Sequence, residues 1–221
     1  MSYQPQPEVF TKQFKLKGSI VHAGLGLLLI LGPLFGGLIA ALFITNIYGD
    51  TAGGITALAA LLLAGVGIYV SDQRVFLIFN SDLRRDLAAA LHRRLGRNPD
   101  DGRAYFVGWA PGPSVNPKDM ETDHDVGFLT LTPELMTFLG DIVAFELRRD
   151  QVLGVDCKQM GLRILLDLGC RVIVYWFDPY GQQNAFTLER REGRTRSQVK
   201  RNNRELAQVL EQWRLYGVVP P

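Results

Sequence analysis

The chain has 221 residues, with 24 Lys and Arg against 22 Asp and Glu, and a mean hydropathy of +0.06. The first 103 residues carry a net charge of +3 and the remaining 118 a net charge of −1. This near balance excludes a polyanion binder by overall charge in the second part. The mean hydropathy is an average over two unlike halves.

Two long uncharged stretches lie near the N-terminus. Lys17 and Asp50 are separated by 32 uncharged residues, and Asp50 and Asp72 by another 21. At about 1.5 Å per residue, the shorter stretch reaches roughly 30 Å, the thickness of a hydrocarbon core. The first stretch is too long for the apolar part of a signal peptide. We therefore predict a two-helix transmembrane hairpin at residues 19–71, after an N-terminal tail at residues 1–18.

Basic residues are confined to the two flanks of this hairpin. Lys12, Lys15 and Lys17 precede the first span, and arginines from Arg74 onward follow the second. The connecting turn carries only Asp50. The positive-inside rule therefore predicts cytoplasmic N and C termini, in a bacterial inner membrane.

Small residues recur at steps of three and four along both predicted spans. They are Gly32, Gly36 and Ala40 in the first span and Gly53, Ala57, Ala60, Ala64 and Gly67 in the second. Such seams predict close helix packing, within the hairpin or against a partner, and leave homo-oligomer formation open. His22 is the only ionisable residue within the spans, so transport has little support. It is also the only candidate ligand for a pigment.

The stretch SDLRRDLAAALHRRLGRN at residues 81–98 predicts a helix that starts at Asn80 or Ser81 and ends at Gly96. Its stripe consists of Leu83, Leu87, Leu91 and Leu95. Its arginines surround the helix, which argues against nucleic acid and favours a helix at the membrane surface, with its leucine edge on lipid or protein. We assign residues 72–103 to a basic juxtamembrane helix and linker.

Residues 104–221 read as one cytoplasmic domain of short strands followed by a helix. The strand-like runs are GFLTL, LMTFL, IVAFEL, QVLGVDC, LRILLD, RVIVYWF and NAFTLE, with AYFVGW as an eighth. Thr195, with Gln198 three residues later, predicts the start of the last helix. The pattern predicts an α+β membrane protein whose antiparallel strands are capped by a C-terminal helix.

The segment LTLTPELMTFLGDIVAFELRRDQVLGVD resembles the opening of PH-like domains of bacterial membrane proteins and of the related GRAM type. The shared features are a strand that ends in Leu-Thr before a turn, and a D-x-V-x-x-V step; the likeness covers residues 127–214. It implies a bent, partly open β-barrel of two sheets, closed by the C-terminal helix. It also implies a domain that binds lipids, peptides or neighbouring subunits. Glu134 and the lack of basic residues in the first hairpin argue against phosphoinositide recognition.

Two basic clusters are candidate contacts for anionic lipid or an acidic partner. They comprise Arg84, Arg85, Arg93, Arg94 and Arg97, and then Arg190, Arg191, Arg194, Arg196, Lys200, Arg201 and Arg204. Cations at the start of the last helix oppose its dipole, which suggests that they serve a purpose. The alternative is a solvated face in which Glu189 and Glu192 neutralise them.

Motifs for catalysis or metal binding find little support. The loop with acidic residues and His124 between Asp119 and Asp125 matches no metal-ligand spacing, so we expect a partner contact there. Cys157 and Cys170 are not in a CxxC pair, and a cytoplasmic location predicts free thiols. We therefore expect no cofactor and no enzymatic activity.

Two functions remain. The chain is either a non-catalytic accessory or scaffold subunit of a larger membrane complex, or a stand-alone membrane-anchored PH-like module that binds anionic lipid or a soluble protein. We take the first as the expectation.

Overall fold

The computed structural model describes residues 2–5, 11–74, 80–96, 98–112, 123–159, 170–193 and 195–219. The chain divides into two compact units. Residues 15–79 form a helical hairpin, and residues 1–14 together with residues 80–221 form a sheet domain. The protein therefore belongs to the α+β class, as predicted.

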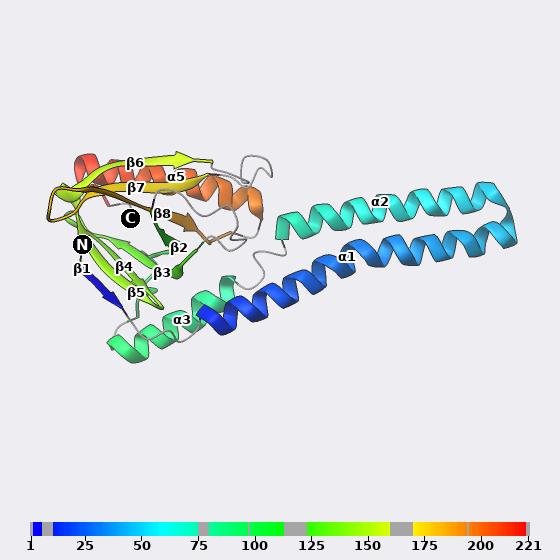
Figure 1. Ribbon diagram of the computed structural model, residues 1–221, viewed down its shortest axis with the longest axis horizontal. Helices are drawn as coiled ribbons and strands as arrows, with labels where there is room; N and C mark the ends of the chain where they lie inside the picture. Colours follow the sequence, from blue (N-terminus) through cyan, green and yellow to red (C-terminus); the bar gives the residue numbers. More distant parts are fainter. Residues whose placement is uncertain are drawn as a thin grey trace. The chain divides into compact units, whose positions relative to one another are not determined.

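The hairpin consists of helix α1 (Thr11–Tyr48) and helix α2 (Asp50–Arg74), which run antiparallel beside each other (Figure 1). Gly49 joins them with a φ of 90°, a conformation that favours glycine. Each helix contains an 18-residue window, Leu31–Tyr48 and Asp50–Gly67, of mean hydropathy 1.6 and 1.5. Both helices are long and apolar enough to cross a membrane.

The small residues of α2 face α1. Gly53, Ala60, Ala64 and Gly67 are buried, and Ala57 is half-buried. A side chain on Gly37 of α1 would collide with Ala60. Close approach of the two backbones therefore depends on the missing side chains at this contact.

The predicted seam of α1 is wrong for packing within the hairpin. Gly32 and Gly36 are exposed, and a methyl group added to either would meet nothing within 4 Å. Ala40 is half-buried, whereas Ala41, one position later, is buried. The steps of four place Gly32 and Gly36 on one face, but α2 contacts the adjacent face, which Gly37 and Ala41 occupy.

The sheet domain contains one antiparallel sheet of eight strands in the order β1-β5-β4-β3-β2-β8-β7-β6. The strands are β1 (Ser2–Pro5), β2 (Tyr105–Pro111), β3 (Asp125–Leu131), β4 (Leu135–Gly140), β5 (Val143–Arg148), β6 (Val152–Lys158), β7 (Arg171–Phe177) and β8 (Gln183–Arg190). A short 3₁₀ turn, Arg149–Gln151, separates β5 from β6. Six of the seven predicted runs, and the eighth at residues 104–109, are strands. The predicted run at residues 162–167 lies outside the described residues.

The segment predicted as an N-terminal tail contains regular structure: residues 2–5 form the strand β1, and α1 begins at Thr11. β1 pairs antiparallel with β5, with Ser2 opposite Glu146 and Pro5 opposite Val143. Without β1, β5 would be an edge strand with unpaired backbone groups. Four residues carry too little periodicity for this pairing to be predicted from sequence.

The main core lies between the two halves of the sheet and helix α5 (Arg196–Tyr216). Thr195 caps α5 by accepting a hydrogen bond from the Gln198 N–H, as predicted. Leu206, Leu210 and Trp213 of α5 are fully buried against the strands. In Figure 1, α5 lies along β6 and β7.

Helix α3 (Asn80–Leu95) packs on the sheet, so the boundary predicted at residue 103 is wrong. Leu83, Leu87 and Leu91 are buried in a second core. Their partners from the strands are Phe106, Val126 and Phe128, together with Ala104 just before β2. These residues alternate along β2 and β3 with those that face the main core. The leucine edge therefore lies on protein, and only Leu95 remains exposed.

Candidate functional site

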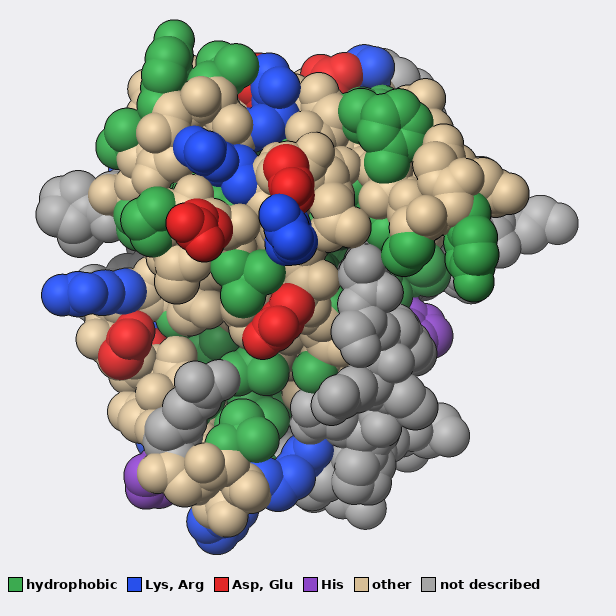
Figure 2. Space-filling view, turned by 90° about the vertical axis from the view of Figure 1, so that its left-hand side faces the viewer, with side chains coloured by type: hydrophobic (Ala, Val, Ile, Leu, Met, Phe, Trp, Pro, Cys, Tyr) green, Lys and Arg blue, Asp and Glu red, His purple; other side chains and the backbone are tan. Residues whose placement is uncertain are grey.

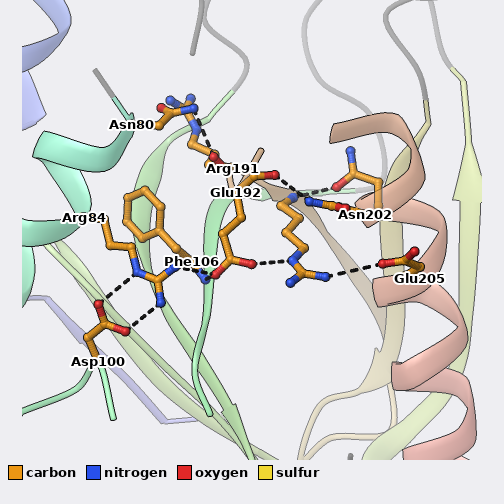
Figure 3. Close-up of polar contacts among 10 residues, drawn as sticks. Asn80, Arg84, Asp100, Phe106, Arg191, Glu192, Asn202 and Glu205 are labelled. Carbon is orange, nitrogen blue, oxygen red and sulfur yellow. Dashed lines mark hydrogen bonds and ion pairs between the residues drawn. The ribbon is translucent and has the colours of Figure 1, made fainter. Parts of the chain in front are cut away.

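A polar junction connects α3, the sheet and α5 (Figure 3). We define it by Asn80, Arg84, Asp100, Arg190, Glu192, Asn202 and Glu205. Asn80 opens α3, and its buried side chain donates a hydrogen bond of 3.1 Å to the carbonyl of Arg191, just after β8. The start of α3 is thereby fastened to the end of β8.

Glu192 is the centre of the junction. Its Oε1 accepts hydrogen bonds from Arg84 Nη1 at 2.8 Å and from the Phe106 N–H at 3.1 Å. Its Oε2 accepts from Arg190 Nε at 2.6 Å. The side chain is only 18% exposed, so its charge depends on these donors instead of on water.

Both arginines extend the junction to a further carboxylate. Arg84 binds Asp100 through two parallel bonds of 2.9 and 2.6 Å, and this pairing raises the pKa of its guanidinium. Arg190 Nη1 lies 3.8 Å from Glu205 of α5. The Asn202 side chain, also from α5, donates to the carbonyl of Glu192 at 2.6 Å. Charges of opposite sign therefore alternate from α3 through the end of β8 to α5.

A second buried network lies around Asp123. This carboxylate is paired with Arg171, and its Oδ2 lies 2.6 Å from Arg191 Nη2. Arg171 also binds Glu189 at 2.9 Å. Burial alone lowers the pKa of Arg171, but the two carboxylates outweigh it and raise the pKa. A side chain on Gly108 would collide with Asp123, so this strand position has to be small.

Asp125 is fully buried and organises the β4–β5 turn. Its two oxygens accept hydrogen bonds of 2.8 to 3.2 Å from four backbone N–H groups. The donors are Val126, Asp141, Ile142 and Val143. Burial raises the pKa of Asp125 to about 6 and outweighs the opposing effect of these donors.

Several predicted lipid or partner contacts are engaged inside the domain. Arg84, Arg190 and Arg191 are bound to carboxylates, and Arg94 lies 3.8 Å from the buried Asp141. Contact of these residues with lipid or a partner stays a prediction. Two buried networks need cations to compensate their carboxylates, so the nearest arginines are held there.

The other Lys and Arg residues of the two predicted clusters are exposed or half-buried, or lie outside the described residues. Arg85 and Arg201 are exposed and meet carboxylates only at 3.4 to 3.5 Å, and Lys200 is half-buried. Arg93 and Arg204 are exposed, with no ion pair among the described residues. Arg97, Arg194 and the side chain of Arg196 are outside the described residues, as is the His22 side chain. On the face in Figure 2, basic and acidic side chains alternate instead of forming a patch of one sign.

The cysteines form a disulfide, so the prediction of free thiols is wrong. Cys157 is bonded to Cys170, with their Cα atoms 5.4 Å apart. Cys157 pairs with Val172 in the β6–β7 ladder, and Cys170 lies two residues before Val172. The antiparallel pairing of β6 with β7 therefore brings the cysteines together, which their spacing in the sequence does not reveal.

The acidic loop is partly described. Asp119 and Glu121 lie outside the described residues, while His124 lies edge-on to the Trp109 ring. Asp123 and Asp125 bind arginines and backbone N–H groups. Within the described ranges, no group of three or more His, Cys, Asp or Glu residues could hold a metal ion.

Sequence reasoning missed the roles of Asp125, Arg171 and the buried Asn203. Asn203 accepts a hydrogen bond from the Arg190 N–H and donates one to the carbonyl of Cys170. A polar residue within the apolar face of α5 was the available signal. The charge pattern of the sequence indicates Glu192 only as a neutraliser of surface charge.

No protein-family model matches the sequence, and no curated protein matches it significantly. The functional conclusion therefore rests on the geometry of the chain itself.

We expect Glu192→Ala to lower the free energy of unfolding of the sheet domain by about 1–3 kcal/mol, because it removes one acceptor from each of two partly buried guanidinium groups, those of Arg84 and Arg190, and the acceptor of one backbone N–H. Glu205→Ala, the matched control, removes a half-exposed carboxylate and should cost less than about 1 kcal/mol. Denaturation of the full-length chain in mild detergent, followed by the fluorescence of the buried Trp109 and Trp213, measures both. Equal costs would contradict a central role for Glu192.

Asp125 should make stability fall as the pH rises. Its pKa is about 6 in the folded chain against 3.8 ordinarily, so the folded state binds more protons between these values. Its contribution to the free energy of unfolding should therefore decrease by about 2 kcal/mol from pH 4 to pH 6.5. Denaturation over this range should show a steeper decrease for the wild type than for Asp125→Asn, which does not titrate. Parallel curves would sink the prediction.

Proposed function

We propose that the chain is a non-catalytic accessory or scaffold subunit of a larger membrane complex. α1 and α2 insert it into a bacterial inner membrane, and a PH-like domain lies at the cytoplasmic face. The observation that carries the proposal is the second small-residue surface of α1, formed by Gly32 and Gly36, which the hairpin itself does not use.

α1 carries small residues on two adjacent faces. Gly37 and Ala41 meet α2, while Gly32 and Gly36 face outward with no atom within 4 Å of an added methyl group. Glycine costs about 1 kcal/mol relative to alanine inside a helix, and within the hairpin the two outward glycines gain no packing in return. In membranes, small residues four positions apart allow another helix to approach closely. This surface suits a neighbouring transmembrane helix.

The strand order supports a PH-like domain. Each strand from β2 to β5 pairs with the next, as do β6 to β8, and β2 pairs with β8 to join the two halves. α5 follows β8 and packs against the core between them. An antiparallel sheet followed by a C-terminal helix agrees with the barrel that the resemblance implies, although the strands form one continuous sheet instead of two. Such domains present surfaces for binding, which suits a scaffold.

The two indicators of sidedness disagree. Lys12, Lys15 and Lys17 and the arginines after α2 favour cytoplasmic termini. The Cys157–Cys170 disulfide favours an oxidising compartment, because disulfides are rare in the cytosol. We give precedence to the basic flanks, since no Lys or Arg lies in the turn between the spans.

Fusions to the C-terminus test this sidedness. Green fluorescent protein should be fluorescent and alkaline phosphatase inactive there, because the first folds in the cytoplasm and the second needs disulfides. Alkaline phosphatase inserted after Gly49, in the turn between α1 and α2, is the matched control and should be active. The reverse pattern would place the sheet domain on the oxidising side.

The subunit proposal predicts that the chain co-migrates with other membrane proteins. After gentle solubilisation, a native gel with mass spectrometry should show the chain well above its monomer size. Gly36→Leu should release most of it, because a bulky side chain would keep a partner helix away. Gly65→Leu is the matched control, since Gly65 is exposed on α2 with nothing within 4 Å of an added methyl group.

A monomer-sized band for the wild type would reject the subunit proposal and favour the stand-alone module. A larger band that contains only this chain would indicate self-association instead of an accessory role.

A further inference from the structure

A shallow groove runs along α3 and is closed on one side by the loop that follows the helix. Its volume is about 590 Å³. The lining residues are Ser81, Arg84, Arg85, Ala88, Ala89, His92, Asn98 and Asp100. Arg84 and Asp100 belong to the junction and Ala88 to the second core, whereas the other lining residues belong to neither.

Two arginines, Arg84 and Arg85, and one carboxylate, that of Asp100, line the groove. Arg84 is fixed by Asp100 and Glu192, so it forms a rigid wall. Arg85 is 74% exposed and its contacts with neighbouring carboxylates are long, at 3.4 Å. His92, two turns further along, is also exposed. Arg85 and His92 can therefore turn toward an anion without breaking a buried ion pair.

The floor of the groove consists of alanines. Ala88 is buried and Ala89 is exposed, and their methyl groups leave room that longer side chains would fill. The hydroxyl of Ser81 adds a hydrogen-bond donor to the lining, and the Asn98 amide, which already donates to the Asp100 carbonyl at 3.1 Å, has a second N–H. A phosphate group offers several acceptor oxygens to such a set, and arginine is well suited to bind it through two bonds.

We infer that this groove binds the phosphate of an anionic membrane-lipid headgroup. Five residues separate the end of α2 at Arg74 from the start of α3 at Asn80, so the two ends can lie at most about 22 Å apart. If α2 spans a membrane, the chain itself holds the first turn of α3 near the headgroups. The inference rests on the membrane insertion in the proposed function, but it requires no partner subunit.

Native mass spectrometry of the full-length chain, released from mild detergent after addition of dioleoyl phosphatidylglycerol, tests the inference. The wild type should retain one such lipid per chain, and dioleoyl phosphatidylcholine should bind more weakly. Arg85→Gln should weaken the retention roughly fivefold, the effect of losing one partly exposed charge contact. Arg93→Gln is the matched control on the same helix, because Arg93 is exposed but does not line the groove, and it should retain lipid like the wild type.

A second variant tests whether lipid binding needs the open volume of the groove, separately from the charge of Arg85. Ala89→Phe should fill the groove and weaken retention at least as much as Arg85→Gln, with no change in net charge. Equal retention by the wild type and both groove variants would overturn the inference, as would equal retention of phosphatidylcholine. Displacement by inorganic phosphate at concentrations comparable to that of the lipid would also overturn the lipid assignment. These readouts are independent of migration on native gels, so this inference and the subunit proposal can fail separately.

Discussion

The carboxylate of Glu192 joins α3 to the sheet and, through neighbouring residues, to α5. It accepts from Arg84 of α3, from a backbone N–H of β2 and from Arg190 of β8, and α5 is bound to the same group of residues. A mostly buried charge is costly unless every lone pair has a hydrogen-bond donor. The helices and strands that carry the donors of Glu192 therefore have to pack in one arrangement. Burial of the α3 leucines stabilises the packing of α3 on the sheet, while the ion pairs of the junction fix where α3 lies along the sheet.

This constraint changes the meaning of the arginine-rich stretches. A cluster of cations suggests a surface for anions, but Arg84, Arg190 and Arg191 compensate carboxylates inside the domain. The two surfaces that we propose for binding are smaller and more specific than these stretches: the α3 groove with Arg85 and His92, and the outward glycines of α1. The glycines belong to the hairpin, and the groove belongs to the helix that follows it.

Local patterns predicted much of the fold. The alternation of apolar residues located β2 to β5 and β6 to β8, and Thr195 marked the start of α5, because these signals depend on neighbours within a few residues. The disulfide and the pairing of β1 with β5 were missed, since each joins residues whose contact depends on the folded sheet. The sequence also leaves open which face of α1 meets α2. Gly32 and Gly37 differ by about 140° around the helix, and only the partner helix decides between them.

The same division between local sequence patterns and long-range contacts holds for the candidate sites. The sequence by itself determined two apolar helices, a short-stranded α+β domain and the distribution of basic residues, because hydrophobic period and charge are properties of the chain. Only the tertiary structure decided which arginines are buried against carboxylates and which stay exposed. Ion pairs such as those of Asp123 with Arg171 and of Arg84 with Glu192 join residues 48 and 108 positions apart. No local pattern encodes such a pairing, because it exists only when the strands and helices that carry the charges are packed together.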